Sequence, residues 1–177
     1  MADHGEELLE HGFIGHASTS ESATVYDEVT QIPLLIKIPG TPAEPVDDIV
    51  RQIDIMPTLF DLMGLKPKYP SQGASLLPLI LKKEKRHTLA LIETSYCGWQ
   101  CPKDRLKERI FAVRSSKWKF VEERKPAGTS HAFYDLVEDP GETANLYGKK
   151  ETGEYQAILS AGLKENDIIL EFNGEKI

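Results

Sequence analysis

The first sixteen residues combine metal-ligating side chains with glycines. Asp3 and His4 are neighbours, and a further imidazole, His16, directly follows Gly15. A carboxylate and a neutral imidazole are ordinary ligands of divalent metals. Neighbouring side chains on a strand point to opposite faces, so Asp3 and His4 can reach one ion only where a strand ends, and Gly5 would give the backbone the freedom to turn there. Because ligands of open α/β sheets bind just beyond strand ends, the segment predicts the rim of a metal-assisted hydrolase site, with His16 approaching from a loop.

The same residues have a simpler interpretation. Acidic and histidine side chains near a terminus are commonly a solvated tail or the first turn of a helix, where carboxylates interact favourably with the helix dipole. Short motifs also match by chance, so the spacing alone leaves both interpretations open.

The residues that follow predict the edge of a larger α/β sheet. Val25, Tyr26 and Val29 have helical spacing after a run of hydroxyl side chains that could cap a helix, and a proline would end it. The apolar run 34–38 is typical of a strand buried on both faces of a parallel sheet. A strand end, a helix and a second buried strand together make a βαβ pattern.

A second helix is predicted between Asp54 and Gly64. Asp54 is placed to cap its start, and Gly64 is placed to end it. Four apolar residues recur at helical spacing, which predicts that one face, methionines included, packs in a core: Met56, Leu59, Phe60 and Met63.

From residue 88 the pattern changes to strands. We expect strands at 88–94 and 131–136, and a hairpin of 109–114 with 117–122 around Ser115-Ser116. The turn Asp139-Pro140-Gly141 would end the last strand. Antiparallel strands after a parallel segment predict a second, smaller α+β unit. The inward positions of the hairpin are expected to be Phe111, Val113, Trp118 and Phe120.

Several blocks of residues form an ordered set along most of the chain. They are Asp3-His4-Gly5-Glu6-Glu7, Glu10-His11-Gly12, Gly15-His16, Tyr26-Asp27-Glu28-Val29, Ile32-Pro33-Leu34-Leu35-Ile36, Asp54-Ile55-Met56-Pro57-Thr58-Leu59, Gly73-Ala74-Ser75-Leu76-Leu77-Pro78-Leu79, Phe133-Tyr134-Asp135-Leu136 and Asp139-Pro140-Gly141-Glu142. In this order they resemble the C-terminal part of a sulfatase, a family of the alkaline-phosphatase superfamily.

The resemblance implies an α/β fold class: the edge of an alkaline-phosphatase-like α/β/α sandwich, followed by a small α+β antiparallel-sheet subdomain. The implied domains are 1–65, the end of the α/β catalytic domain; 66–150, the C-terminal α+β subdomain; and 151–177, a linker with a partial PDZ-like segment.

The resemblance also implies roles for individual residues. Asp3 and His4 match the family's metal ligands. The implied cofactor is a divalent cation, most often Ca²⁺. His16 matches a substrate-binding position that contacts the sulfate, where an imidazolium would stabilise negative charge. Calcium prefers oxygen donors whereas imidazole suits Zn or Mn, so a metal-dependent phosphatase or phosphodiesterase of the same superfamily is the alternative.

The resemblance further implies a nucleophile that these residues do not provide. Sulfatases use a formylglycine made in a Cys/Ser-x-Pro-x-Arg motif, and the 177 residues contain no such motif. In Cys101-Pro102 the proline follows the cysteine at once, so this pair does not qualify. We therefore expect no catalytic residue in this chain and no sulfuric ester hydrolase activity from it alone. Cys97 and Cys101 form either a small disulfide or two inert thiols.

The last stretch, 161–174, resembles the middle of a PDZ domain and ends in Asn173-Gly174, which predicts a two-residue hairpin turn. Only part of such a domain is present, so we expect no peptide binding. A non-catalytic interaction module is the alternative function that this tail suggests.

Composition narrows the range of partners. A net charge of −7 argues against nucleic acid, and no apolar run is long enough to span a membrane. The chain opens without the features of a signal peptide, while the sulfatase resemblance suggests a periplasmic or secreted protein. The expected partner is a sulfate-ester substrate of a longer parent enzyme. A run such as 34–38 without cover also predicts exposed apolar surface and poor solubility.

Overall fold

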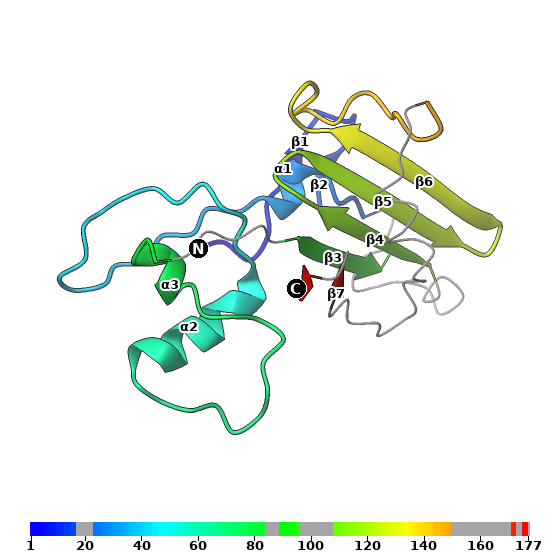
Figure 1. Cartoon of the computed structure of the whole chain (residues 1–177). Helices are drawn as coiled ribbons and strands as arrows, with labels where there is room; N and C mark the ends of the chain where they lie inside the picture. The colour runs from blue at the N-terminus through cyan, green and yellow to red at the C-terminus, as the bar shows by residue number, and fades with distance from the viewer. Residues whose placement is uncertain (17–22, 84–88, 96–107, 150–170, 173–174, 177) are drawn as a thin grey trace. The chain divides into compact units, whose positions relative to one another are not determined.

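The computed structural model describes residues 1–16, 23–83, 89–95, 108–149, 171–172 and 175–176 (Figure 1). The elements in chain order are β1 (Glu7–Leu8), β2 (Ile14–Gly15), α1 (Asp27–Thr30), the 3-10 helix η1 (Gln52–Asp54), α2 (Ile55–Leu62), α3 (Leu77–Ile80), β3 (Ala90–Ser95), β4 (Arg109–Arg114), β5 (Trp118–Lys125), β6 (Gly128–Asp135), β7 (Glu171–Phe172) and β8 (Glu175–Lys176). They fall into two compact units, Met1–Leu35 with Leu91–Ile177, and Ile36–Ala90. Among the described residues, none of the helices has the length and apolar character to cross a membrane.

The first unit is built on a four-stranded sheet in the order β3-β4-β5-β6 (Figure 1). β4 pairs antiparallel with β5, and β5 with β6, so the predicted hairpin and the antiparallel sheet are confirmed. Ser115 closes the turn between β4 and β5, because its Oγ accepts hydrogen bonds from the amides of Lys117 at 3.2 Å and Trp118 at 3.1 Å.

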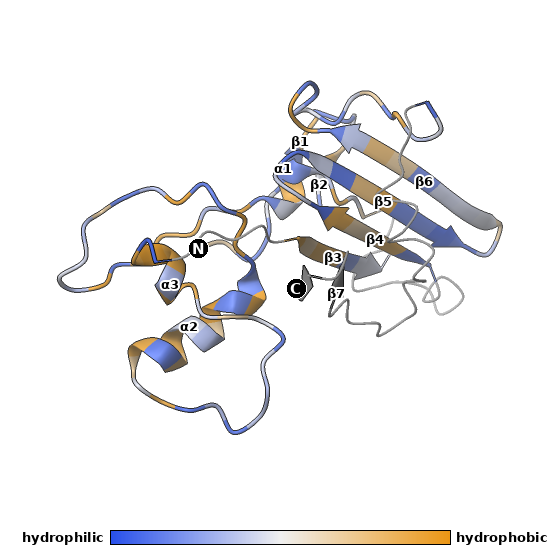
Figure 2. Cartoon of the chain, viewed as in Figure 1, coloured by the Kyte–Doolittle hydropathy of each residue, from blue (hydrophilic) through white to orange (hydrophobic). Residues whose placement is uncertain are grey.

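Both faces of this sheet are covered. Four consecutive residues of β4, Ile110 to Val113, are buried, and Figure 2 colours much of that strand as hydrophobic. Alternate residues point to opposite faces, so such a run needs cover on both sides. Phe111, Val113 and Phe120 are buried as predicted, and Trp118 is half-buried. The core on the other face consists of Ala23, Val25, Ile110, Ala112, Val121 and Tyr134.

Lys119, near the start of β5, is fully buried between two carboxylates. Its Nζ lies 2.6 Å from Asp27 Oδ1 and 2.8 Å from Glu142 Oε1, and it donates a 2.9 Å hydrogen bond to the Val25 carbonyl. Arg114 brings a second cation, with Nε and Nη2 both donating to the Asp27 carboxylate. This group of four charges, named here the Lys119 cluster (Lys119, Arg114, Asp27 and Glu142), joins the start of α1 to the sheet and to the loop after β6.

The two carboxylates of the Lys119 cluster differ in their acidity. Burial raises the pKa of the Asp27 carboxyl, but the hydrogen bond from Arg114 and the charge of Lys119 outweigh burial, so the pKa lies below its usual value. For Glu142 burial outweighs the attraction of Lys119, and the pKa lies above its usual value. Glu142 also accepts a 2.6 Å hydrogen bond from the Asp27 amide, which fixes its position beside α1.

In the second unit a buried aspartate organises α2. The fully buried Asp54 carboxylate accepts hydrogen bonds from the amides of Arg51 at 3.0 Å and Ala74 at 2.9 Å. Thr58 donates to the Asp54 carbonyl at 2.6 Å and accepts from the Leu76 amide at 2.8 Å, so α2 is joined to the start of α3. The carboxylate of Asp54 therefore stabilises η1 and the loop before α3. It does not make the capping hydrogen bond to the backbone of α2 that was expected from the sequence.

The predicted helix is confirmed, but its predicted core face is wrong. α2 spans Ile55–Leu62, and Gly64 ends it with a φ of +65°. Met56 is 57% exposed, and Met63 is 60% exposed. The buried residue of α2 is Thr58, whose hydroxyl donates a hydrogen bond to the Asp54 carbonyl and accepts one from the Leu76 amide. The two methionines form no comparable hydrogen bonds among the described residues.

The predicted strand at 34–38 is also wrong. Residues 31–38 carry no strand or helix, and Leu35 is 84% exposed. The first helix is shorter than predicted, since α1 begins at Asp27 and Val25 is a buried residue of the extended segment before it. The described residues therefore form no βαβ unit at the N-terminus. Exposed apolar surface, which was expected from this run, is confirmed.

Near the C-terminus, β7 pairs antiparallel with β8, with Phe172 opposite Glu175. This pairing confirms the hairpin predicted around Asn173-Gly174. The remainder of the PDZ-like stretch, together with Cys97 and Cys101, lies outside the described residues.

Replacing Lys119 with methionine should lower the free energy of unfolding by about 3–5 kcal/mol, because the buried Glu142 and the partly buried Asp27 lose the cation between them. Urea denaturation followed by tryptophan fluorescence measures the change. Lys117→Met, two residues away and exposed, is the matched control and should change stability by no more than about 0.5 kcal/mol. A loss below about 1 kcal/mol for Lys119→Met would contradict the role given to the Lys119 cluster.

Candidate functional site

A short hairpin brings the chemically interesting residues of the N-terminus together. β1 and β2 pair antiparallel, with Glu7 opposite Gly15 and Leu8 opposite Ile14. The connecting turn is closed by a 2.8 Å hydrogen bond from the Leu9 amide to the carbonyl of Phe13. This register places the residues just before β1 beside those just after β2.

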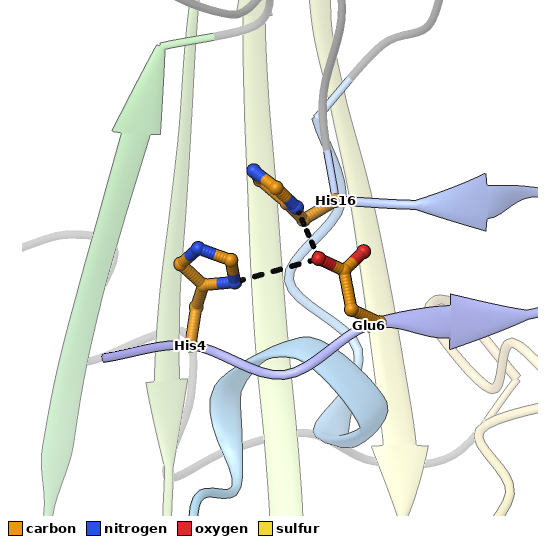
Figure 3. A group of neighbouring side chains, drawn as sticks. All are labelled: His4, Glu6 and His16. Atoms are coloured by element: carbon orange, nitrogen blue, oxygen red, sulfur yellow. Dashed lines mark hydrogen bonds and ion pairs between the residues drawn. The ribbon is translucent and has the colours of Figure 1, made fainter. Parts of the chain in front are cut away.

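His4, Glu6 and His16 lie together at the open end of this hairpin (Figure 3). One potential ligand atom of each residue lies within 4.8 Å of the other two. The Glu6 carboxylate reaches both rings, with Oε1 2.8 Å from His16 Nδ1 and 3.9 Å from His4 Nδ1. The two ring centroids are 4.0 Å apart. We call these three residues the His–Glu–His cluster; their side chains are 41% (His4), 46% (Glu6) and 43% (His16) exposed.

The hydrogen bonds of His4 determine which nitrogen it presents. Nδ1 lies 3.0 Å from the Gly5 carbonyl, which only accepts, so Nδ1 carries the hydrogen and Nε2 of the neutral ring has the lone pair. This hydrogen bond, together with the charges of Asp3 and Glu6, raises the pKa of His4. Asp3 Oδ2 lies 3.7 Å from His4 Nε2, and backbone hydrogen bonds hold the pKa of the Asp3 carboxyl below its usual value.

Glu6 orients His16. An ionised carboxylate only accepts, so the 2.8 Å contact is a hydrogen bond from His16 Nδ1 to Glu6 Oε1. The Nε2 atom of His16 is then directed away from Glu6, as Figure 3 shows. The sequence alone assigns no direct role to Glu6. The only indication of its role in the sequence was its position, two residues after His4 and just before a short strand. That position becomes informative only once the pairing of β1 with β2 is known.

A close backbone contact explains Gly5. A Cβ at Gly5 would lie 1.9 Å from the carbonyl oxygen of Glu28, and the Gly5 amide donates a 2.8 Å hydrogen bond to Val29. The sequence suggested freedom to turn as the reason for this glycine; the structure adds a second reason, because the close approach leaves no room for a side chain. Gly5 allows the end of α1 to pack against the backbone beside His4.

His11 and Glu7 anchor the hairpin to the rest of the unit. His11 Nε2 donates a 2.9 Å hydrogen bond to the Gly141 carbonyl, and its ring stacks on Tyr26 with centroids 3.5 Å apart. Glu7 is fully buried and accepts a hydrogen bond from the Thr24 hydroxyl. These contacts fix the hairpin beside α1 and the loop after β6, so they support the site without taking part in it.

The arrangement can bind a cation or an anion. Two imidazoles with one carboxylate are ordinary ligands of a divalent metal, and a protonated His16 would attract an anionic group. The structure brings His4 and His16 together and leaves Asp3 beside His4. Their predicted roles, as metal ligands for Asp3 and His4 and as a sulfate-binding residue for His16, stay predictions.

Comparison with known proteins gives one family match. Residues 15–168 match the family described as N-sulphoglucosamine sulphohydrolase, C-terminal. The matched range begins just before His16 and runs past residue 150 into the stretch that we expected to be a linker and PDZ-like segment.

Among characterised proteins, the chain is similar to a Delta 4,5-hexuronate-2-O-sulfatase of Bacteroides thetaiotaomicron, with 30% identity over 169 residues that cover 90% of this chain and 33% of the relative. It is also similar to arylsulfatase K of Canis lupus familiaris, with 27% identity over 150 residues that cover 84% of this chain and 27% of the relative. The chain therefore spans about a third of the length of these relatives or less.

Solved structures show the same relationship. One of them, described as a complex with its substrate D-glucosamine-2-N,6-O-disulfate, superposes with a TM-score of 0.68 and 25% identity, covering 90% of this chain and 31% of the other. A second, described as a 2-O GAG sulfatase, gives a TM-score of 0.68 at 27% identity, with 90% and 33% covered. These neighbours have the alkaline-phosphatase-like fold, which confirms the predicted α/β fold class.

Substituting alanine at Gly5 should displace α1 from the hairpin, because the new methyl group would overlap the Glu28 carbonyl. We expect a loss of about 1–3 kcal/mol in the free energy of unfolding, as for overpacked sites. Gly141→Ala is the control, since its Cβ would meet only the Thr143 methyl group at 3.7 Å. Equal stability of the two variants in chemical denaturation would show that the Gly5 contact is not tight.

The tautomer of His16 gives a direct test of its pairing with Glu6. In the neutral ring the hydrogen should reside on Nδ1, and Glu6→Ala should shift the population towards the Nε2–H form that is common in unrestrained histidines. Nitrogen-15 chemical shifts of the ring report the tautomer. An unchanged tautomer ratio in Glu6→Ala would mean that the hydrogen bond is not formed in solution.

Proposed function

Because the chain belongs to the N-sulphoglucosamine sulphohydrolase C-terminal family, we propose that it supplies the metal- and sulfate-binding side chains of a sulfuric ester hydrolase. The observation that carries this proposal is the meeting of His4 and His16, which lie on opposite arms of the hairpin and are held beside one another through Glu6. Side chains that are distant in sequence and converge in this way suit a small, charged ligand.

The chemistry of a sulfate ester explains the need for such residues. The sulfuryl oxygens carry negative charge, and the leaving oxygen gains more as its bond to sulfur breaks, so preorganised positive groups stabilise the transition state. His16 meets this need as an imidazolium, since Nδ1 is held by Glu6 and Nε2–H is left to donate to a sulfate oxygen. The hydrogen bond to Glu6 also fixes the ring plane, which limits the entropy lost on binding.

Asp3 and His4 fit part of a divalent-metal site. Asp3 Oδ2 and His4 Nε2 are 3.7 Å apart, close to the separation of about 3–3.4 Å between neighbouring ligands of one ion, and the Nδ1–H of His4 is bound to a backbone carbonyl as ligating imidazoles usually are. A divalent cation held there would neutralise charge on the sulfate. Calcium takes six to eight oxygen ligands, so calcium would have to draw most of its oxygens from elsewhere.

The nucleophile must come from residues outside this sequence. The 177 residues contain no Cys/Ser-x-Pro-x-Arg, and the chain spans about a third of its relatives. We therefore propose that these residues alone do not hydrolyse a sulfate ester and that they complete the active site of a longer sulfatase. Sulfated sugars are the proposed substrates, since the Bacteroides relative is described as a hexuronate-2-O-sulfatase.

Activity measurements test the proposal. The 177-residue chain should release no sulfate from an aryl sulfate above the buffer rate. A polypeptide that joins it to a preceding segment with a matured Cys/Ser-x-Pro-x-Arg motif should be active, and His16→Ala should lower its kcat about 10²–10³-fold, the usual effect of removing one charge-stabilising donor. His131→Asn, at a histidine of β6 that bonds to Glu122, is the matched control and should keep its activity.

Two outcomes would contradict the proposal. Hydrolysis by the 177-residue chain that His16→Ala abolishes would show that it contains its own nucleophile. Faster turnover of phosphate esters than of sulfate esters by the longer polypeptide would favour a phosphatase of the same superfamily.

A further inference from the structure

The donor atoms of the His–Glu–His cluster do not match the cation expected for a sulfatase. Calcium binds six to eight oxygens, whereas this cluster offers two imidazole nitrogens and one carboxylate. Two imidazoles and one carboxylate are the protein ligands of many zinc sites, in which a fourth position is left to water or substrate. From this disagreement we propose that His4, Glu6 and His16 form a site for a zinc-like divalent transition ion in this chain.

The spacing of the three side chains supports the site. Ligand atoms about 2.0–2.1 Å from a tetrahedral ion lie about 3.4 Å from one another. The Oε1 atom of Glu6 lies 2.8 Å from His16 Nδ1, and one potential ligand atom of each of the three residues lies within 4.8 Å of the other two. Since all three side chains are partly exposed, small rotations about their side-chain bonds can bring the donors to an ion without moving the backbone.

The surrounding hydrogen bonds are also those of a metal site. A ligating imidazole usually donates its second N–H to a carbonyl or carboxylate, and this contact fixes the ring. His4 has such a contact from Nδ1 to the Gly5 carbonyl at 3.0 Å, so its Nε2 is the nitrogen available to an ion. Between His16 and Glu6 the ion would take the place of the hydrogen that now joins them, with the hydrogen of the neutral ring moving to Nε2.

The backbone that carries these ligands is held from several sides. β1 and β2 fix the two arms in register, the Gly5 amide bonds to Val29, and His11 bonds to the Gly141 carbonyl. A preorganised backbone lowers the entropy lost when an ion is bound, which favours binding by these three side chains.

This inference assigns the ligands of the cation differently from the proposed function, in which Asp3 and His4 hold the cation and His16 contacts the sulfate. The two assignments predict different contributions of Asp3, Glu6 and His16 to metal binding, and these contributions can be measured. The His–Glu–His cluster needs Glu6 and His16, whereas the sulfatase assignment needs Asp3 and leaves His16 for the substrate.

Isothermal titration of the 177-residue chain with Zn²⁺ and with Ca²⁺ tests the inference. Zn²⁺ should bind at one site and more tightly than Ca²⁺. His4→Ala, Glu6→Gln and His16→Ala should each weaken Zn²⁺ binding at least about tenfold, the scale for loss of groups at a metal site. Asp3→Asn should have a smaller effect than Glu6→Gln, and Glu138→Gln, which removes an exposed carboxylate elsewhere, should have none.

Cobalt spectroscopy identifies the ligands independently of activity. Co²⁺ should give the visible absorption of a tetrahedral nitrogen and oxygen site without a thiolate charge-transfer band. The double variant Cys97→Ser/Cys101→Ser should bind with unchanged affinity, because the cysteines are not ligands in this proposal.

Three results would overturn the inference. The first is Ca²⁺ binding that is as tight as Zn²⁺ binding, and the second is binding that is lost with the cysteines. The third is binding that needs Asp3 and His4 but not Glu6 or His16, which would leave the proposed function intact. Conversely, Zn²⁺ binding with the expected variant pattern, combined with a longer polypeptide that cleaves no sulfate ester, would support the metal site and refute the sulfatase proposal.

Discussion

The first unit depends on one buried lysine. Lys119 has no access to solvent, and its ammonium group is stable there only because Asp27 and Glu142 lie within hydrogen-bonding distance and the Val25 carbonyl accepts a further bond. Removing an ammonium group from water is costly, so any conformation that separates these partners is strongly disfavoured. The Lys119 cluster thus selects one docking of the N-terminal segment on the sheet.

That docking positions the candidate site. Asp27 begins α1, and the last turn of α1 supplies the Val29 carbonyl that binds the Gly5 amide beside His4. Glu142 belongs to the loop whose Gly141 carbonyl accepts from His11 of the hairpin. The same two carboxylates that neutralise Lys119 therefore hold the elements on which the His–Glu–His cluster depends.

Local sequence patterns predicted most of the helices and strands. Long-range contacts, which those patterns do not show, determine which residues are buried and which residues meet at the candidate site. The alternation around Ser115-Ser116 and the spacing before Gly64 gave the β4–β5 hairpin and α2, because both depend on neighbours in sequence. The apolar run 34–38 was misassigned, since an apolar run becomes a strand only where a neighbouring strand pairs with it and other elements cover it, and neither condition is visible in the local sequence. Lys119 would be placed on a solvent face by its charge, and its partners at 27 and 142 are too distant to appear in any local pattern. Glu6 was missed for the same reason, as two-residue strands leave no periodicity.

The brevity of β1 and β2 has a consequence for dynamics. With only two residue pairs between its arms, the hairpin gains little from its own ladder and depends on anchors at Gly5 and His11. Segments of this kind open by local fluctuation at a lower free energy than the sheet that supports them. The rings of His4 and His16 can thus separate and reapproach while β4, β5 and β6 stay folded, so the geometry of the His–Glu–His cluster can change without global unfolding.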